Sequence, residues 1–157
     1  MKIIAFLAVI AFAGIVLLPL QSYAEPHLRP QNAAYLEVGG AAMLGSLNYQ
    51  RNFFFSERGH VSARIGMLYG GRGQALIPIT LFYSFAVKHG TFELGAGYTA
   101  SRPKDGYPSV HLIGGFKKQI KNNLFFKILA TPVYPLNPKK YDPPFWPWGG
   151  ISLGWDF

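Results

Sequence analysis

The sequence predicts an all-β fold, an eight-stranded antiparallel up-and-down transmembrane β-barrel. Three observations predict it. An uncharged apolar segment with a small-residue cleavage pattern stands near the amino terminus. Almost all of the remaining chain alternates bulky apolar residues with small or polar ones, as strands with two different faces do. The last strand ends on an aromatic residue, Phe157. Aromatic residues reach 16% and charged residues only 14%, which is unusual for a basic soluble protein.

The amino-terminal segment predicts export. Lys2 precedes an uncharged run from Ile3 to Leu20, and Ser22 and Ala24 supply the small residues that a signal peptidase needs. We expect a signal peptide over residues 1–24, a flexible periplasmic lead-in over 25–33 and the barrel over 34–157. The alternative is an uncleaved anchor helix, because the run from Ile3 to Leu20 is nearly long enough to span a bilayer.

Eight strands follow one another, an even number that suits an outer-membrane barrel. Pro78 is awkward inside a ladder and predicts a bulge or a strand's outer end. A basic turn is expected over Lys118 to Asn123 and a long Pro-rich loop over Pro132 to Pro147. The predicted strands are Tyr35–Leu44, Ser46–Phe54, Val61–Tyr69, Leu76–Ala86, Phe92–Thr99, Val110–Lys117, Leu124–Thr131 and Trp148–Phe157.

The two faces of these strands differ in size and polarity. An eight-stranded barrel has an interior just wide enough for side chains to fill, so we expect the small and polar set inside and the bulky set toward lipid. Buried charges must be paired, and we expect Glu37 and Glu93 to pair with Arg64 and Lys127. The expected interior polar network is Glu37, Arg64, Glu93, His111 and Lys127, with Lys117 and Asp156 on the same inward face.

Aromatic residues near the strand ends predict girdles at the two membrane interfaces. The alternative is that they are only strand formers that pack a soluble core. The girdle candidates are Tyr35, Phe53, Phe54, Tyr69, Tyr83, Phe85, Phe92, Tyr98, Trp148 and Trp155.

The last strand carries a resemblance. Ile151, Leu153, Trp155 and Phe157 share one face, and this pattern resembles the terminal signal by which the outer-membrane assembly machinery recognises its clients. With the export signal, the eight strands and the polar interior, the chain resembles small outer-membrane barrels of the OmpA and OmpX type. The stretches Tyr35–Gly40 and Ser46–Arg51 are also similar to uncharacterised small barrels of the Bacteroidota. Unlike OmpA, the chain shows no peptidoglycan-binding domain after the barrel.

The resemblance implies a multi-pass protein of a Gram-negative outer membrane. Its expected partners are outer-membrane lipids, lipopolysaccharide and the barrel assembly machinery, and a monomer is expected. We expect a structural or surface-interaction role without an open pore. A narrow small-solute channel and a secreted ligand-binding barrel are alternatives.

The Pro-rich loop and its neighbours supply the candidate binding residues at the surface. Prolines restrict the loop, aromatics give it a binding surface, and basic residues form a rim that could bind the phosphates of lipopolysaccharide. The alternative is that the loop packs over the barrel mouth and the lysines are only solvated. The candidates are Arg72, Arg102, Lys104, Lys139, Lys140, Tyr141 and Trp146.

Some barrels of this size modify lipid A or phospholipid, and such an enzyme is the alternative function. The chemistry needs a nucleophile, a His base and an orienting acid. Ser109, His111 and Asp105 lie near one another in sequence. Their order is the reverse of the His-before-Ser order in deacylase-like barrels, and His111 is predicted to face inward. We therefore expect no catalytic residues.

No cofactor, metal or nucleic acid is expected. His27, His60 and His89 show no metal-ligand spacing, and the chain has no cysteine. The basic residues, which give a formal charge of +8, lie in separate turns of an exported chain rather than on one nucleic-acid-binding face.

Overall fold

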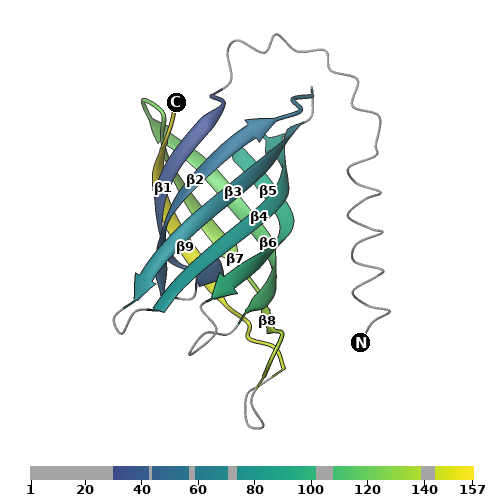
Figure 1. The fold of residues 1–157 in the computed structure, drawn as a ribbon. Coiled ribbons are helices and arrows are strands. Elements are labelled where there is room, and N and C mark those ends of the chain that lie inside the picture. Colours follow the sequence, from purple (N-terminus) through teal and green to yellow (C-terminus); the bar gives the residue numbers. More distant parts are fainter. Residues whose placement is uncertain (1–29, 43, 57–58, 71–73, 102–107, 139–143) are drawn as a thin grey trace.

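The chain folds into a closed antiparallel β-barrel (Figure 1). The computed structural model describes residues 30–42, 44–56, 59–70, 74–101, 108–138 and 144–157. The elements are β1 (Asn32–Gly39), the short 3-10 helix η2 (Gly40–Ala42), β2 (Gly45–Phe53), β3 (Gly59–Gly70), β4 (Gln74–Val87), β5 (Gly90–Ser101), β6 (Ser109–Lys121), β7 (Leu124–Ala130), β8 (Val133–Pro135) and β9 (Gly149–Asp156).

Each strand from β1 to β6 pairs with the next along the chain, and β9 closes the barrel between β7 and β1. At the closing seam Leu36 stands opposite Leu153. Strands β7 and β8 occupy one place in the wall, because both pair with β6 in the same register on either side of Pro132. Proline has no backbone N–H to donate to a ladder. The predicted all-β, eight-stranded antiparallel barrel is therefore confirmed.

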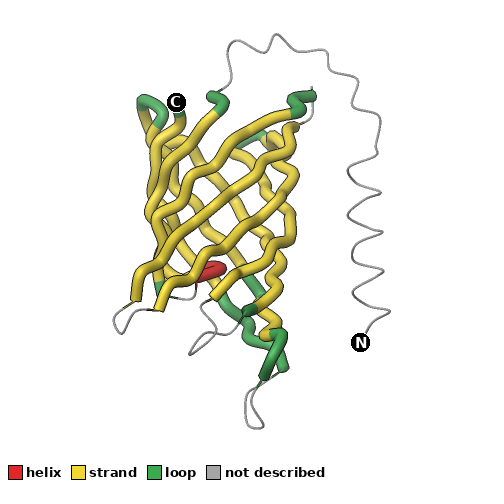
Figure 2. Tube along the Cα trace, viewed as in Figure 1, coloured by secondary structure: helices red, strands yellow, loops and turns green. Residues whose placement is uncertain are grey.

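The two ends of the barrel differ (Figure 2). The turn end carries Phe157, the turn between β4 and β5 and the turn between β6 and β7; the loop end carries η2 and β8. The β6–β7 turn consists of Asn122 and Asn123 with φ angles of 45° and 68°. Two successive residues with positive φ suit the right-handed twist of a hairpin. The predicted basic turn over Lys118–Asn123 is thus wrong in extent, since β6 continues to Lys121.

The first predicted strand, Tyr35–Leu44, is also wrong in extent. Gly39 and Gly40 have φ angles of 80° and 67°, which side-chain-bearing residues rarely adopt. The chain therefore leaves β1 at Gly39 and turns inward, so that η2 lies buried inside the loop end of the barrel (Figure 2). There η2 contacts β2, β3, β4 and β9.

Replacing Gly40 with alanine should destabilise the barrel by about 1–3 kcal/mol, the range for a residue held in an unfavourable backbone conformation. A Cβ atom there would also collide with the Glu37 carboxylate. Unfolding in urea measures the loss. Gly114→Ala is the matched control, because the nearest atom to its new Cβ is Leu94 Cδ2 at 3.7 Å. Equal losses in the two variants would contradict this account of η2.

Pro78 lies in the interior of β4, so the predicted bulge or strand end is wrong. It pairs with Thr99 of β5, and the β3–β4 register is the same on both sides of it, at Ile65–Ile79 and Leu68–Leu76. A Cβ on Gly66 would stand 2.9 Å from the proline ring. The glycine therefore leaves room for the proline ring and also for Asn48 Oδ1, with which that Cβ would collide.

The Pro-rich segment 132–147 is not a loop throughout. Val133 exchanges two backbone hydrogen bonds with Trp146, at 3.0 and 2.9 Å, and Thr131 N donates to Trp148 O at 2.7 Å. Strand β8 thus extends the β7–β9 hairpin at the loop end (Figure 1), where Trp146 pairs with Val133. Prolines without N–H donors interrupt this ladder without abolishing it.

Candidate functional site

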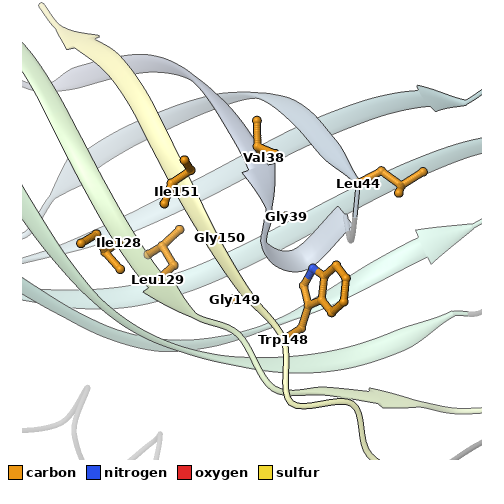
Figure 3. Close-up of a pocket in the computed structure, with 9 residues that line it drawn as sticks. All are labelled: Val38, Gly39, Leu44, Ile128, Leu129, Trp148, Gly149, Gly150 and Ile151. Atoms are coloured by element: carbon orange, nitrogen blue, oxygen red, sulfur yellow. The ribbon is translucent and has the colours of Figure 1, made fainter.

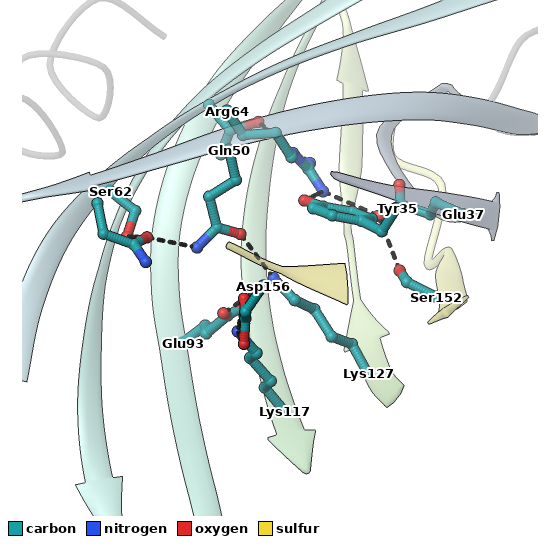
Figure 4. A network of polar contacts seen from close by, with 12 residues as sticks. Tyr35, Glu37, Gln50, Ser62, Arg64, Glu93, Lys117, Lys127, Ser152 and Asp156 are labelled. Atoms are coloured by element: carbon teal, nitrogen blue, oxygen red, sulfur yellow. Dashed lines mark hydrogen bonds and ion pairs between the residues drawn. The ribbon is translucent and has the colours of Figure 1, made fainter. Parts of the chain in front are cut away.

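The barrel interior holds a chain of buried charged and polar side chains (Figure 4). Strand alternation directs Glu37 of β1 and Arg64 of β3 inward, and Arg64 Nη1 donates to Glu37 Oε2 at 2.8 Å. Ser152 Oγ of β9 donates to the same oxygen at 3.3 Å. Arg64 also donates through Nε and Nη2 to Thr80 Oγ1, at 3.3 and 3.1 Å. The planar guanidinium therefore joins three parts of the wall.

A second ion pair is buried in the interior and joins β7 to β5, the two neighbours of β6. Lys127 Nζ of β7 lies 2.9 and 3.0 Å from the two carboxylate oxygens of Glu93 on β5, and it donates to Gln50 Oε1 of β2 at 2.8 Å. The ammonium also stands 4.6 Å from the centre of the Tyr35 ring, a cation–π distance. Both charges are buried, and their pairing removes the cost of an isolated ion.

A third ion pair lies toward the turn end. Lys117 Nζ donates to Asp156 Oδ1 and Oδ2 at 2.6 and 2.7 Å, and Gln119 Nε2 donates to Oδ2 at 3.2 Å. The three described acids, Glu37, Glu93 and Asp156, are therefore all engaged inside the barrel.

His111 of β6 is buried between two threonines. Its Nε2 lies 3.0 Å from Thr80 Oγ1 and its Nδ1 lies 3.3 Å from Thr99 Oγ1. Thr80 Oγ1 receives the Arg64 donors, so its own proton is free for Nε2; Thr99 donates to the Ala41 carbonyl at 3.1 Å and so accepts from Nδ1. A neutral His111 protonated on Nδ1 thus links the polar interior to η2.

The Ser109 and His111 pair does not form a nucleophile and base in this arrangement. Both ring nitrogens of His111 are directed at threonine hydroxyls. Ser109 is buried at the end of β6, opposite Pro135, and Asp105 lies outside the described residues. In the described part of the chain, no group of three or more His, Cys, Asp or Glu side chains could hold a metal ion.

The interior also contains large aromatic side chains, which corrects the expectation of a uniformly small and polar set. Tyr35, Phe82 and Phe125 are buried, and the Tyr35 and Phe125 rings meet edge to face at 5.8 Å. The predicted girdle position of Tyr35 is therefore wrong. Lys117 Nζ lies 4.1 Å from the centre of the Phe125 ring, so the aromatic faces help to hold the buried ammonium groups.

The outer wall is apolar around the whole barrel. Each of the eight strands of the closed barrel exposes large aliphatic side chains on its outer face, and the Leu36 side chain is 65% exposed. On β9 the predicted assembly-signal residues Ile151, Leu153, Trp155 and Phe157 are exposed. The exposed aliphatic residues include Leu36 and Val38 on β1, Leu47 on β2, Ile65 and Met67 on β3, Ile77, Ile79 and Leu81 on β4, Leu94 on β5, Val110 and Leu112 on β6, Ile128 on β7, and Ile151 and Leu153 on β9.

A shallow groove interrupts this wall at the loop end (Figure 3). It has a volume of about 640 Å³, and glycines of β1 and β9 leave the space between apolar side chains. Its apolar lining continues the surrounding wall. The lining residues are Val38, Gly39, Leu44, Ile128, Leu129, Trp148, Gly149, Gly150 and Ile151.

Among the predicted surface-loop candidates, the structure describes Trp146. Its backbone pairs with Val133 in the extended hairpin. The sequence predicted a basic turn over Lys118–Asn123 but assigned no binding role to the exposed lysines of the turn end, which are Lys88, Lys118 and Lys121. The candidates Arg72, Arg102, Lys104, Lys139, Lys140 and Tyr141 lie outside the described residues.

No protein-family model, curated protein or solved structure matches the chain. Among the described residues, no helix has the length and apolar character needed to cross a membrane.

Proposed function

We propose that the chain is an integral outer-membrane β-barrel protein of OmpA/OmpX-like architecture, whose outer wall contacts lipid. The apolar exposure of the entire wall carries this proposal. Soluble monomers rarely expose contiguous apolar patches larger than a few hundred Å². A closed barrel, in which the strands satisfy one another's backbone hydrogen bonds, can place such a wall in hydrocarbon.

The two barrel ends suit opposite sides of the membrane. Outer-membrane barrels have short periplasmic turns and longer outer loops. The two-residue turns at Lys88–His89 and Asn122–Asn123 lie at the turn end, and the extended β7–β9 hairpin lies at the loop end. We assign the turn end to the periplasm and the loop end to the cell surface.

The interior supports a structural or surface-interaction role without an open pore. The Arg64–Glu37 and Lys127–Glu93 pairs, which join β3 to β1 and β7 to β5, occupy interior space that a channel would need. Eight strands leave an interior that side chains can fill. Lipopolysaccharide and outer-membrane lipids are the proposed contacts of such a protein.

Cell fractionation tests this proposal. The protein should appear in the outer-membrane fraction, resist extraction with alkaline carbonate, and migrate faster on a detergent gel before boiling than after it. A soluble periplasmic or secreted barrel would be released by carbonate. Recovery of most of the folded protein in the soluble fraction would overturn the proposal.

A further inference from the structure

The exposed charged side chains of the described chain have one sign. All three described acids are buried in ion pairs. The exposed charged side chains are Arg51, Lys88, Lys118 and Lys121, and all of them lie at the turn end. The interior pairing therefore leaves this end of the described barrel with an excess of positive charge.

Three of these residues lie on two neighbouring hairpins, and we call this cluster the turn-end lysines: Lys88, Lys118 and Lys121. Lys88 lies in the turn between β4 and β5, and the other two lie at the end of β6. Strands β5 and β6 pair as far as Thr91 and Lys117. The β4–β5 hairpin, which carries Lys88, is therefore next to the β6–β7 hairpin, which carries Lys118 and Lys121.

An aromatic row borders the turn-end lysines on the outer wall. Phe85, Phe92 and Phe116 are register partners on β4, β5 and β6, and their successive ring centres are 5.7 and 5.2 Å apart. Lys118 follows Phe116 by two residues and thus shares its outward face. The wall passes from exposed aliphatic residues such as Leu94 through aromatic rings to ammonium groups as it approaches the turn end.

We propose that the turn-end lysines bind the phosphate of an anionic phospholipid headgroup, with the aromatic row at the level of the membrane interface. The proposal rests on the membrane placement of the barrel. Aromatic rings favour the boundary between hydrocarbon and headgroups. Lysine stems can lie along apolar surface while their ammonium groups reach the polar region, and basic residues near a membrane surface attract anionic lipids. No exposed acidic side chain in the described part of the barrel opposes this attraction.

The full chain, folded into phosphatidylcholine vesicles that contain phosphatidylglycerol, provides the test. Electron spin resonance with spin-labelled phosphatidylglycerol and spin-labelled phosphatidylcholine gives the relative association constant of each lipid for the barrel wall. The wild-type protein should select phosphatidylglycerol, and salt should weaken the selection. The variant K88Q/K118Q/K121Q should lower the selectivity about threefold or more, whereas K88R/K118R/K121R should retain it.

Arg51→Gln and Lys118→Gln are a matched pair, since each removes one exposed cation from the turn end and only Lys118 belongs to the cluster. Lys118→Gln should reduce the selectivity more. Equal association of the two lipids with wild-type barrel, full selectivity in the triple Gln variant, or equal effects of the matched pair would overturn the inference. Absence of any motionally restricted lipid would instead show that the membrane placement itself is wrong.

Discussion

Replacing Leu36 with arginine should destabilise the barrel by about 2–4 kcal/mol if its wall lies in a membrane, the range for a basic residue at the bilayer midplane of such barrels. Leu36 is 65% exposed and stands between Leu47 of β2 and Leu153 of β9, which are exposed aliphatic residues themselves. An arginine there would bring a guanidinium into hydrocarbon. Urea titration of the protein folded in phospholipid vesicles measures the change.

The same substitution separates a membrane barrel from a soluble one. At an exposed site on a soluble protein, a surface substitution changes stability by only about 0.5 kcal/mol or less. His89→Arg is the control, because His89 is exposed in the β4–β5 turn, where a membrane barrel meets water. A neutral Leu36→Arg variant would contradict the lipid-facing assignment of the wall.

Alternation of residue type was enough to predict the closed barrel, because one-sided burial in a strand imposes a period of two. It could not predict where β1 ends, since Gly39 and Gly40 fit the strand pattern and only their positive φ angles turn the chain inward. It also misjudged Pro78, whose place inside β4 depends on Gly66 of the neighbouring strand. The first error concerns a local backbone conformation, and the second arises from a contact between neighbouring strands.

The interior polar network was also predictable only in part. Strand alternation in the sequence predicts that four charged side chains point inward: Glu37, Arg64, Glu93 and Lys127. The partner of each one depends on strand register and on the length of the side chains. The structure pairs Glu37 with Arg64, and Glu93 with Lys127. Tyr35 shows the limit of pattern reasoning, because an aromatic residue near a strand end fits a girdle as well as an interior ring beside a buried ammonium.

Replacing Glu37 with alanine should destabilise the barrel by about 3–5 kcal/mol, because removal of one member of a buried ion pair leaves the other charge uncompensated. Arg64 Nη1 would lose its carboxylate partner at 2.8 Å, and Ser152 Oγ would lose its acceptor. Leu36 and Glu37 are neighbours on β1 that face opposite ways, so the two variants test the two faces of one strand. Urea titration in vesicles again gives the loss.

A double-mutant cycle distinguishes the ion pair from packing alone. Removing both charges, in Glu37→Ala with Arg64→Met, should cost less than the sum of the single losses, because no unpaired charge then remains inside the barrel. Additive losses would mean that Glu37 acts through packing against η2 and not through Arg64. A loss below about 1 kcal/mol in Glu37→Ala, the size of one ordinary hydrogen bond, would mean that water reaches and solvates Arg64 in the barrel interior.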